Sequence, residues 1–438
     1  MTTPPDAQPS QSFDSRALRP DHQLTLFKGG ETFFPALVEA IAAARAEVLL
    51  ETYIFDIARS VIPVAQALTD AAARGVTVRV MLDGVGTGDI PAEWQQRWME
   101  AGVHWHVFNP ARGWRLLLPK RWRRLHRKLC VVDGAVAFCG GINLLDDYFD
   151  PNHGALEQPR FDFSVRATGP LVADMHDTMI RLWARLQVAR EAREHDFAGA
   201  LEAVRVAARA GTDMADAGIR DTAKKIQHGE GGAPAEARSE AHSSGAQAAL
   251  VLRDNVRFRR RIEGMYRVAI AQAKTEILIA NAYFIPGVQL QRALLRAAKR
   301  GVKITLLLQG RYEYFMQYHA SRAVYGVLLN AGVEIIEYEA SFLHAKVAVM
   351  DAESGAIATV GSSNLDPLSL LLAREANVFV RDDAFAAELR GHLLQAIAQQ
   401  GRRVDPDVHS KRAFMPRALV WVAYGLMRMA LFATGKRY

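Results

Sequence analysis

Two stretches of the sequence decide the fold: residues 126–133 read HRKLCVVD and residues 344–351 read HAKVAVMD. Both have the form H-x-K-x-x-x-x-D, and each is followed by glycine and asparagine, as GGIN at 140–143 and GSSN at 361–364. A His and a Lys two residues apart on a strand point to the same face, and the apolar residues after them are typical of a buried strand. Glycine lets the backbone approach an anion closely. Two complete copies predict a symmetric pocket for a phosphodiester.

The duplication extends beyond these motifs. The strings at 47–55, 72–76 and 101–103 resemble those at 276–284, 298–302 and 331–333, at nearly constant offsets. A repeat of this length indicates two homologous halves and excludes a solenoid of short repeats.

Strand and helix patterns alternate in each half. Because strand-helix-strand order implies right-handed crossovers, the sequence predicts an α/β fold with a mostly parallel sheet in each half. We expect two lobes related by a pseudo-twofold axis, with the active site at their interface. The predicted strands are 48–53, 76–82, 103–107, 277–282, 302–308 and 333–337, and the predicted helices are 62–74, 92–101, 288–300 and 320–331.

Length, composition and charge indicate the domain organisation and the kind of substrate. The chain has 438 residues, half of them hydrophobic, and a net charge of +7, which suits an anionic substrate or surface. The predicted organisation is a disordered tail over 1–20, a first lobe over 21–197, an Ala/Gly/Ser-rich insertion over 198–248, a second lobe over 249–405 and a basic, apolar segment over 406–438. The tail contains no apolar stretch that would predict a signal peptide.

Two charged or apolar segments suggest contact with a membrane. The basic run at 120–128 leads directly into the first motif, with Trp114 and Trp122 nearby. It is either an ordinary solvated face or a funnel for anionic headgroups, and its position favours the funnel. Residues 418–434 are nearly all apolar but contain Arg428. That run is short for a spanning helix, so it predicts an interfacial helix, with a helix packed on a lobe as the alternative.

The cysteines and histidines give no sign of a metal site. Cys130 and Cys139 lie in apolar strand segments, where buried, inert thiols are expected and a disulfide is not. No Cys/His cluster has the spacing of a zinc site. We therefore expect no metal and no cofactor.

The paired motifs resemble those of the phospholipase D superfamily, and the chain is most similar to bacterial cardiolipin synthases of the B type. The resemblance covers roughly residues 21–381 apart from the insertion. Two departures are the absence of the two N-terminal transmembrane helices of the best-known synthases and the longer spacing from Asp351 to Gly361 than from Asp133 to Gly140. The strings that carry the resemblance are ETYIF at 51–55, RDN at 253–255, ANAYFIPG at 280–287, GSSNLDPLS at 361–369 and EANV at 375–378.

The resemblance implies a two-step transfer through a phosphohistidine. One His attacks phosphorus, and the other protonates the leaving alkoxide and then deprotonates the incoming alcohol. The commoner pattern in the superfamily makes His126 the nucleophile and His344 the acid and base. Lys128 and Lys346 would neutralise the phosphoryl oxygens. Asn143 and Asn364 would bind them by hydrogen bonds.

Carboxylates complete the predicted site. The motif residues Asp133 and Asp351 belong to the catalytic signature, although the resemblance implies that their role is mainly structural. A later carboxylate should fix the tautomer of each His. Glu375 matches that carboxylate in the second half, and Asp162 is the candidate in the first.

The implied activity is transfer of a phosphatidyl group between two phosphatidylglycerol molecules, giving cardiolipin and glycerol, at the cytoplasmic side of the bacterial cell membrane. The expected partners are this anionic phospholipid and the membrane surface, and no nucleic acid. Alternatives are a hydrolytic phospholipase D, a phosphodiesterase nuclease and an inactive membrane scaffold. The basic run would suit DNA as well as lipid, but the apolar C-terminal segment favours lipid, and both intact motifs disfavour the scaffold.

Overall fold

The computed structural model describes residues 18–110, 123–191, 243–253, 258, 260–312, 315–351, 355–366 and 373–406. The predicted interfacial helix, most of the tail and of the insertion, and the basic run as far as Trp122 lie outside these described residues.

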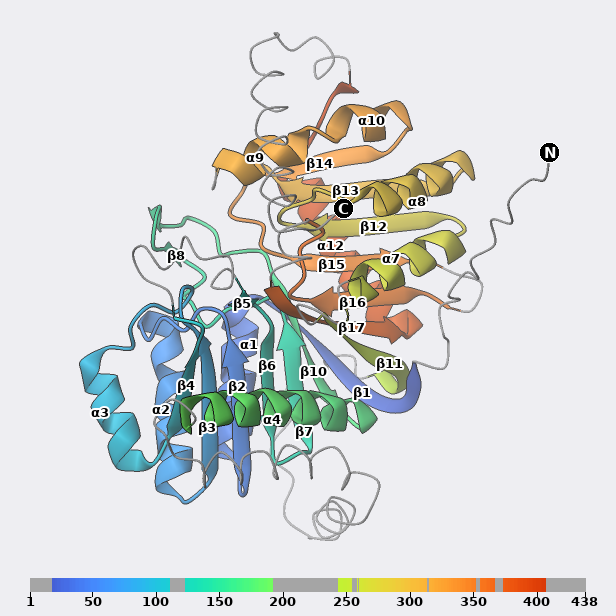
Figure 1. The fold of residues 1–438 in the computed structure, drawn as a ribbon. Coiled ribbons are helices and arrows are strands. Elements are labelled where there is room, and N and C mark those ends of the chain that lie inside the picture. The colour runs from blue at the N-terminus through green and yellow to red at the C-terminus, as the bar shows by residue number, and fades with distance from the viewer. Residues whose placement is uncertain are drawn as a thin grey trace, which may run out of the picture.

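One continuous sheet runs through both halves of the chain (Figure 1). In the first half the spatial order of strands is β4-β3-β2-β6-β7-β10-β1, and in the second it is β14-β13-β12-β15-β16-β17-β11, with β18 added at the outer edge. Strands β1 and β11 pair with each other, so the sheet crosses from one half to the other at its centre. The strands are β1 (Arg19–Lys28), β2 (Glu47–Thr52), β3 (Thr77–Asp83), β4 (His104–Phe108), β6 (Lys128–Val132), β7 (Val136–Gly140), β10 (Phe163–Thr168), β11 (Ser243–Arg253), β12 (Glu276–Asn281), β13 (Lys303–Gln309), β14 (Glu334–Tyr338), β15 (Lys346–Met350), β16 (Ile357–Gly361), β17 (Ala373–Arg381) and β18 (Gly401–Arg403).

The prediction of a mostly parallel sheet is wrong. Only the outer strands of each half, β2-β3-β4 and β12-β13-β14, are parallel and connected through helices. Each H-x-K strand instead runs antiparallel to its neighbours on both sides. In the first half, the physical reason for the pairing of β6 with β7 is the short turn after the motif, where Asp133 and Gly134 both have positive φ. A tight turn returns the chain as a hairpin, whereas a parallel strand would need a long crossover.

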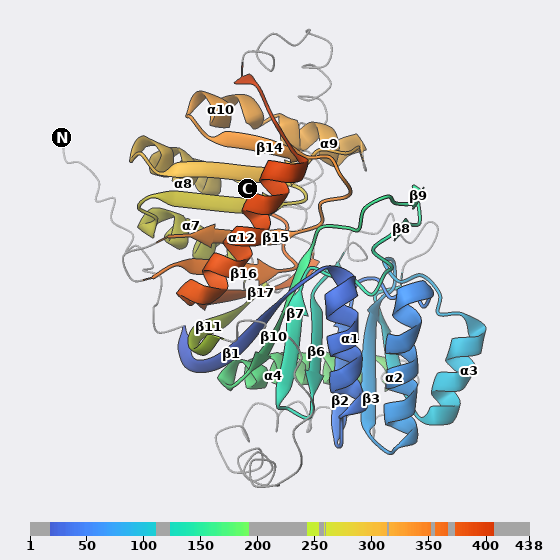
Figure 2. The same ribbon diagram turned by 180° about the vertical axis from the view of Figure 1, so that it is seen from behind.

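Helices cover both faces of the sheet (Figures 1 and 2). Apolar cores lie between the outer parallel strands and two helix groups, α1–α3 in the first half and α7, α8 and α10 in the second. Helices α4 and α12 pack on the central core. The helices are α1 (Gly29–Ala42), α2 (Ile62–Ala73), α3 (Ala92–Ala101), α4 (Pro170–Glu191), α7 (Arg261–Gln272), α8 (Val288–Lys299), α9 (Phe315–Arg322), α10 (Tyr325–Asn330) and α12 (Asp383–Gln400).

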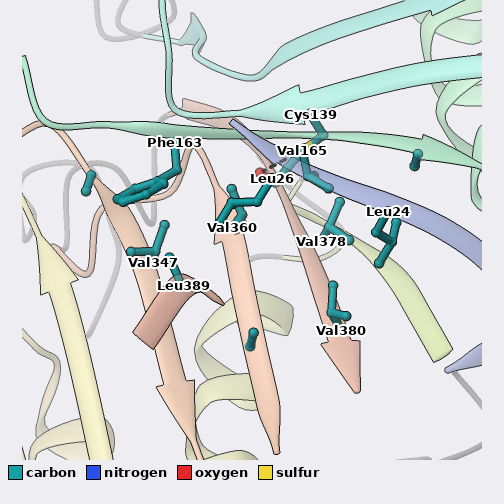
Figure 3. Close-up of a cluster of buried hydrophobic side chains, with 14 of the residues drawn as sticks. Leu24, Leu26, Cys139, Phe163, Val165, Val347, Val360, Val378, Val380 and Leu389 are labelled. Atoms are coloured by element: carbon teal, nitrogen blue, oxygen red, sulfur yellow. Dashed lines mark hydrogen bonds between the residues drawn. The ribbon is translucent and has the colours of Figure 1, made fainter. Parts of the chain in front are cut away.

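The central core joins the two halves. It combines side chains of β1, β7 and β10 with side chains of β15, β16, β17 and α12 in a single cluster. Figure 3 shows Leu26, Cys139 and Val165 of the first half close to Val360 and Val378 of the second. Because both lobes bury apolar surface against each other, burial holds their relative orientation, and the interface can carry a precise site.

Several predicted boundaries differ from the structure. The single helix expected over 320–331 is two helices, α9 and α10. The predicted domain limits at 20/21 and 248/249 fall inside β1 and β11. The two cysteines are buried free thiols, as predicted. Across the described residues, no helix is both long and apolar enough to span a bilayer.

Candidate active site at the interface of the two halves

Two His–carboxylate pairs form the centre of the site, and each pair takes one residue from each half. His126 Nδ1 lies 3.1 Å from Glu375 Oε2, and His344 Nδ1 lies 2.5 Å from Asp162 Oδ2. The two carboxylate side chains are fully or nearly fully buried, whereas 15% and 21% of the His126 and His344 side chains remain exposed. With Nδ1 fixed by a carboxylate, Nε2 of each ring is the nitrogen left for chemistry.

Backbone pairing between the halves explains this crossed arrangement. The short strand β5 (Arg124–Leu125) pairs with β17, and the His126 amide donates to the Arg374 carbonyl at 3.0 Å. In the same way the His344 amide donates to the Phe161 carbonyl at 2.9 Å. The segment before each H-x-K strand therefore lies against the segment that carries the other half's carboxylate, Glu375 in β17 or Asp162 just before β10.

The two lysines lie beneath the histidines. Lys128 Nζ donates to the His126 carbonyl at 2.7 Å, and Lys346 Nζ donates to the His344 carbonyl. Lys346 Nζ is also 4.0 Å from Asp162 Oδ2. Burial lowers the pKa of Lys128 to about 7, in spite of the opposing charge of Glu375. Both ammonium groups thus occupy the low-dielectric interior where an anionic phosphate would be strongly attracted.

The motif aspartates lie at the opposite end of their strands. Asp133 accepts hydrogen bonds from the amides of Arg45, Ala46 and Glu47, which lead into β2. Asp351 likewise accepts from the backbone at the start of β12. This placement agrees with the structural role that the resemblance implies for both residues, because each fixes the end of its motif strand to the start of the neighbouring strand.

The asparagines follow the second strand of each hairpin. Asn143 Oδ1 accepts a hydrogen bond from the Ile54 amide at 3.3 Å, so its amide nitrogen is the group able to donate elsewhere. Asn364 is almost completely buried. The next residue, Leu365, donates its amide to Asn281 Oδ1. The loops after β2 and β12 therefore hold the asparagine loops in place.

The two dyads differ in their electrostatics. Burial lowers the pKa of His126, with Glu375 opposing the effect. Burial alone would raise the pKa of Glu375, but the charge and hydrogen bond of His126, with Lys128 and Arg253, outweigh it and lower that pKa. Burial and the charge of Lys346 lower the pKa of His344. Burial raises the pKa of Asp162 to about 7, although Lys346 and Lys128 act against this rise. These shifts favour the ionised form of Glu375, and they favour a proton shared by Asp162 and His344 below about pH 7.

Sequence reasoning assigned no role to three other residues at the site. Ser362 Oγ donates to Glu375 Oε2 at 2.5 Å. The Tyr53 ring lies 4.7 Å from the His126 ring, between centroids, and 5.3 Å from Lys128 Nζ. Arg253 is opposite Glu375 in the β11–β17 register. Ser362 could have been found from the difference between GGIN and GSSN, while Tyr53 and Arg253 gave no signal beyond their place in the strings shared with the family.

The described residues contain no group of three or more His, Cys, Asp or Glu side chains able to hold a metal ion. Lys128 and Lys346 both act electrostatically on each of the two histidines.

Comparisons with known proteins agree with this geometry. The family model "Cardiolipin synthase, PLD-like domain" matches residues 37–156 and 266–397, one match in each half. The chain belongs to this family of cardiolipin synthases. It is 35% identical to cardiolipin synthase B of Salmonella typhi over 412 residues, covering 94% of this chain and 89% of that protein. It is 33% identical to cardiolipin synthase B of Escherichia coli K12 over 423 residues, with the same coverage.

Among solved structures, phosphatidylserine synthase of Haemophilus influenzae has a TM-score of 0.60 at 12% identity, and the match covers 94% of this chain and 95% of that one. At this identity the match shows the fold only. The predicted fold class, two phospholipase D-like halves of α/β type, is confirmed. The predicted enzyme class is confirmed as well, because the cardiolipin synthase family consists of phosphatidyltransferases of this superfamily.

Proposed function

We propose that this cardiolipin synthase family member joins two phosphatidylglycerol molecules into cardiolipin and releases glycerol, with His126 as the nucleophile. The observation that carries the proposal is the crossed pair of dyads, which presents two imidazole Nε2 atoms over two buried lysines in one site. Transfer through a covalent intermediate requires both a nucleophile and an acid, and neither half alone provides a complete dyad.

The electrostatic difference between the dyads supports the division of roles. Neutral His126, held by ionised Glu375, attacks phosphorus through Nε2 and breaks the bond to the glycerol oxygen. The proton held by His344 and Asp162 goes to that oxygen, and glycerol leaves. His344 then takes the proton of a hydroxyl on the second phosphatidylglycerol. The resulting oxygen attacks phosphorus, breaks the P–N bond to His126 and forms cardiolipin.

The lysines and asparagines would stabilise the charge that develops on the phosphoryl oxygens. Lys128 and Lys346 are buried below the histidines. A bound anionic phosphodiester would raise the lowered pKa of Lys128 and favour its charged form, so the positive charge would need no reorganisation during the reaction. The amide groups of Asn143 and Asn364 would donate hydrogen bonds to the same oxygens. Turnover should accordingly persist in EDTA, measured on detergent-dispersed lipid to avoid effects of cations on the membrane surface.

The direct test is to incubate the purified protein with labelled phosphatidylglycerol in mixed micelles and to identify the products. Cardiolipin and glycerol in equal amounts would support the transferase. Phosphatidic acid as the main product would make the chain a hydrolase with the same site, and cleavage of DNA without lipid turnover would make it a nuclease. We further propose that the protein acts at the cytoplasmic side of the membrane as a peripheral enzyme.

A further inference from the structure

The exposed large apolar side chains of the described residues are unevenly distributed. Eight such residues are exposed. Six of them lie near the carboxyl end of β4 or in segments that follow β2, β3, β7, β12 and β13, at the end of the sheet where His126 and His344 precede their strands. We call these six residues the apolar rim: Ile62, Val85, Val107, Tyr148, Val288 and Tyr312. The other two, Met99 and Val327, lie in α3 and α10, the helices that lead back to the amino ends of β4 and β14.

The loops of the first half that carry the rim are connected to the site. The loop with Val85 contacts Tyr53, because Thr87 Oγ1 donates to the Tyr53 carbonyl at 3.0 Å. Tyr53 in turn packs on His126. Ile62 begins α2, just after Ser60, whose hydroxyl donates to Asp146 at 2.9 Å near Tyr148.

Contacts across the interface continue the rim into the second half. Residues Tyr148 to Ala155 form a loop and the β8–β9 hairpin (Phe149–Asp150 with Gly154–Ala155), which projects beside the interface in Figure 1. His153 of this hairpin packs on Phe342 at 4.9 Å between ring centroids. The Arg311 guanidinium lies 5.5 Å from the same ring, next to Tyr312.

Basic residues accompany the apolar ones. Arg59 and Arg311 are exposed on these same segments, and Arg59 lies 3.8 Å over the Phe149 ring. Arg123 is also exposed, and its carbonyl accepts a hydrogen bond from Asn109 Nδ2, just after β4, at 3.0 Å. Exposed Asp89 and Glu157 are also present, so the charge is mixed and the apolar residues carry the main argument. Apolar side chains flanked by arginine suit the boundary between acyl chains and anionic headgroups.

We propose that the apolar rim is the surface through which this protein docks on an anionic lipid bilayer, with the dyads facing the membrane. The inference rests on the proposed function. A phosphatidylglycerol molecule has two long acyl chains, and exposing them to water costs about 0.8 kcal/mol per CH₂. An enzyme acting on its headgroup must therefore bring the site to the bilayer surface. The rim lies at the same end of the sheet as the two histidines.

The test uses an environment-sensitive fluorophore on single introduced cysteines. Cys130 and Cys139 are buried, and burial raises the pKa of both thiols to about 12, so introduced thiols will be labelled selectively. Val85→Cys and Tyr312→Cys report on the rim, and Met99→Cys and Val327→Cys are matched controls on exposed apolar positions elsewhere. On vesicles of phosphatidylcholine and phosphatidylglycerol, the rim labels should shift to the blue and the control labels should not.

A second variant measures the consequence for turnover. Substituting Ile62, Val85, Tyr148 and Tyr312 together by Ser should lower turnover on vesicles about tenfold. Turnover of monomeric short-chain phosphatidylglycerol should stay the same. The pair Met99→Ser and Val327→Ser should change neither rate.

Other results would overturn the proposal. They are rim labels that stay unshifted, control labels that shift as much as the rim labels, or a rim variant with wild-type turnover on vesicles. If the rim labels shifted but the protein made no cardiolipin, the proposal of a docking surface would still hold and the proposed function would be rejected.

Discussion

The two halves orient a catalytic His with a buried carboxylate in two different ways. Asp162 and Glu375 occupy equivalent register positions, two residues before the partners of Gly140 and Gly361. The shorter carboxylate faces Gly141, where a Cβ atom would lie only 2.3 Å from Asp162 Oδ1. The longer one faces Ser362 in the same place, and the Ser hydroxyl bonds to it. The chain length of the carboxylate and the size of the facing residue have thus changed together.

A second difference lies below the histidines. In the first half Glu51 and Arg127 form a buried ion pair, with Arg127 Nη2 donating to Glu51 Oε1 at 2.8 Å and also to the Thr178 carbonyl of α4. Glu51 lies opposite Leu129 just as Ala280 lies opposite Val347. The second half therefore has Ala280 and Ala345 where the first has a charged pair. The same His-Lys geometry is therefore supported by a buried ion pair in one half and by two apolar side chains in the other.

The largest expected effect tests whether the halves form one site. His126→Ala and His344→Ala should each lower turnover by at least about 10³-fold, because each removes one partner of a single reaction. Phosphate-labelled covalent enzyme should accumulate in His344→Ala and be absent in His126→Ala. Substantial turnover in either variant would separate the halves into independent sites, and label in the opposite variant would exchange the two roles.

The crossed pairing predicts a large effect from the carboxylates. Glu375→Gln and Asp162→Asn should each lower turnover about 10²- to 10⁴-fold, since the orientation and charge of one imidazole would be lost. In single-turnover measurements Glu375→Gln should slow formation of the phosphohistidine as His126→Ala does.

Double variants check which His each carboxylate serves. Adding Glu375→Gln to His126→Ala should cost little more than His126→Ala alone. If Glu375→Gln instead coupled to His344→Ala, the pairing would run within the second half, contrary to the 3.1 Å contact of Glu375 with His126.

The sequence predicts much of this site but not its pairing. The H-x-K strands, the lysines and the asparagines could be identified because a repeated motif fixes positions along a strand, whereas Glu375 and Asp162 were expected only from the resemblance to the superfamily. Which carboxylate faces which His depends on contacts between segments about 180 to 250 residues apart, which no local pattern contains. The central strands β1 and β11 were missed for a related reason: their neighbours in the sheet are distant in sequence, and their ends fall in segments of polar or Ala/Ser-rich composition.

The buried ion pair of Glu51 and Arg127 can be tested for its contribution to the stability of the fold. Glu51→Met or Arg127→Met alone leaves one buried charge without its partner and should cost about 3–5 kcal/mol in the free energy of unfolding. The double variant with Met at both positions imitates the second half, where the equivalent side chains are the apolar Ala280 and Ala345. It should be more stable than either single variant, as measured by urea denaturation. A double variant as unstable as the sum of the singles would show that the pair contributes nothing as a pair.

A smaller effect should appear in the pH dependence. The first step needs the proton held by His344 and Asp162, and the pKa of Asp162 is raised to about 7. Turnover should therefore fall as pH rises through the pKa of this pair, by about tenfold per pH unit above it. In Asp162→Asn this high-pH limb should move to lower pH, because the remaining His344 has a lowered pKa. An unchanged limb would assign the acid to another group.

The smallest expected effect concerns the serine that distinguishes the second dyad. Ser362→Ala removes the hydrogen bond to the ionised Glu375 and the acceptor of the Ala376 amide. It should lower turnover about tenfold, with KM nearly unchanged, since the Glu375 side chain is fully buried. Ser363→Ala is the matched control: it is equally buried, but its hydroxyl donates to the Asn364 carbonyl at 3.2 Å. The first half orients its own carboxylate without any such hydroxyl, because Gly141 occupies that position. If Ser362→Ala retained wild-type turnover and pH dependence, the hydroxyl would only fill space beside the longer carboxylate. The two dyads would then differ in packing, and the electrostatic difference would rest on Arg253 and the lysines.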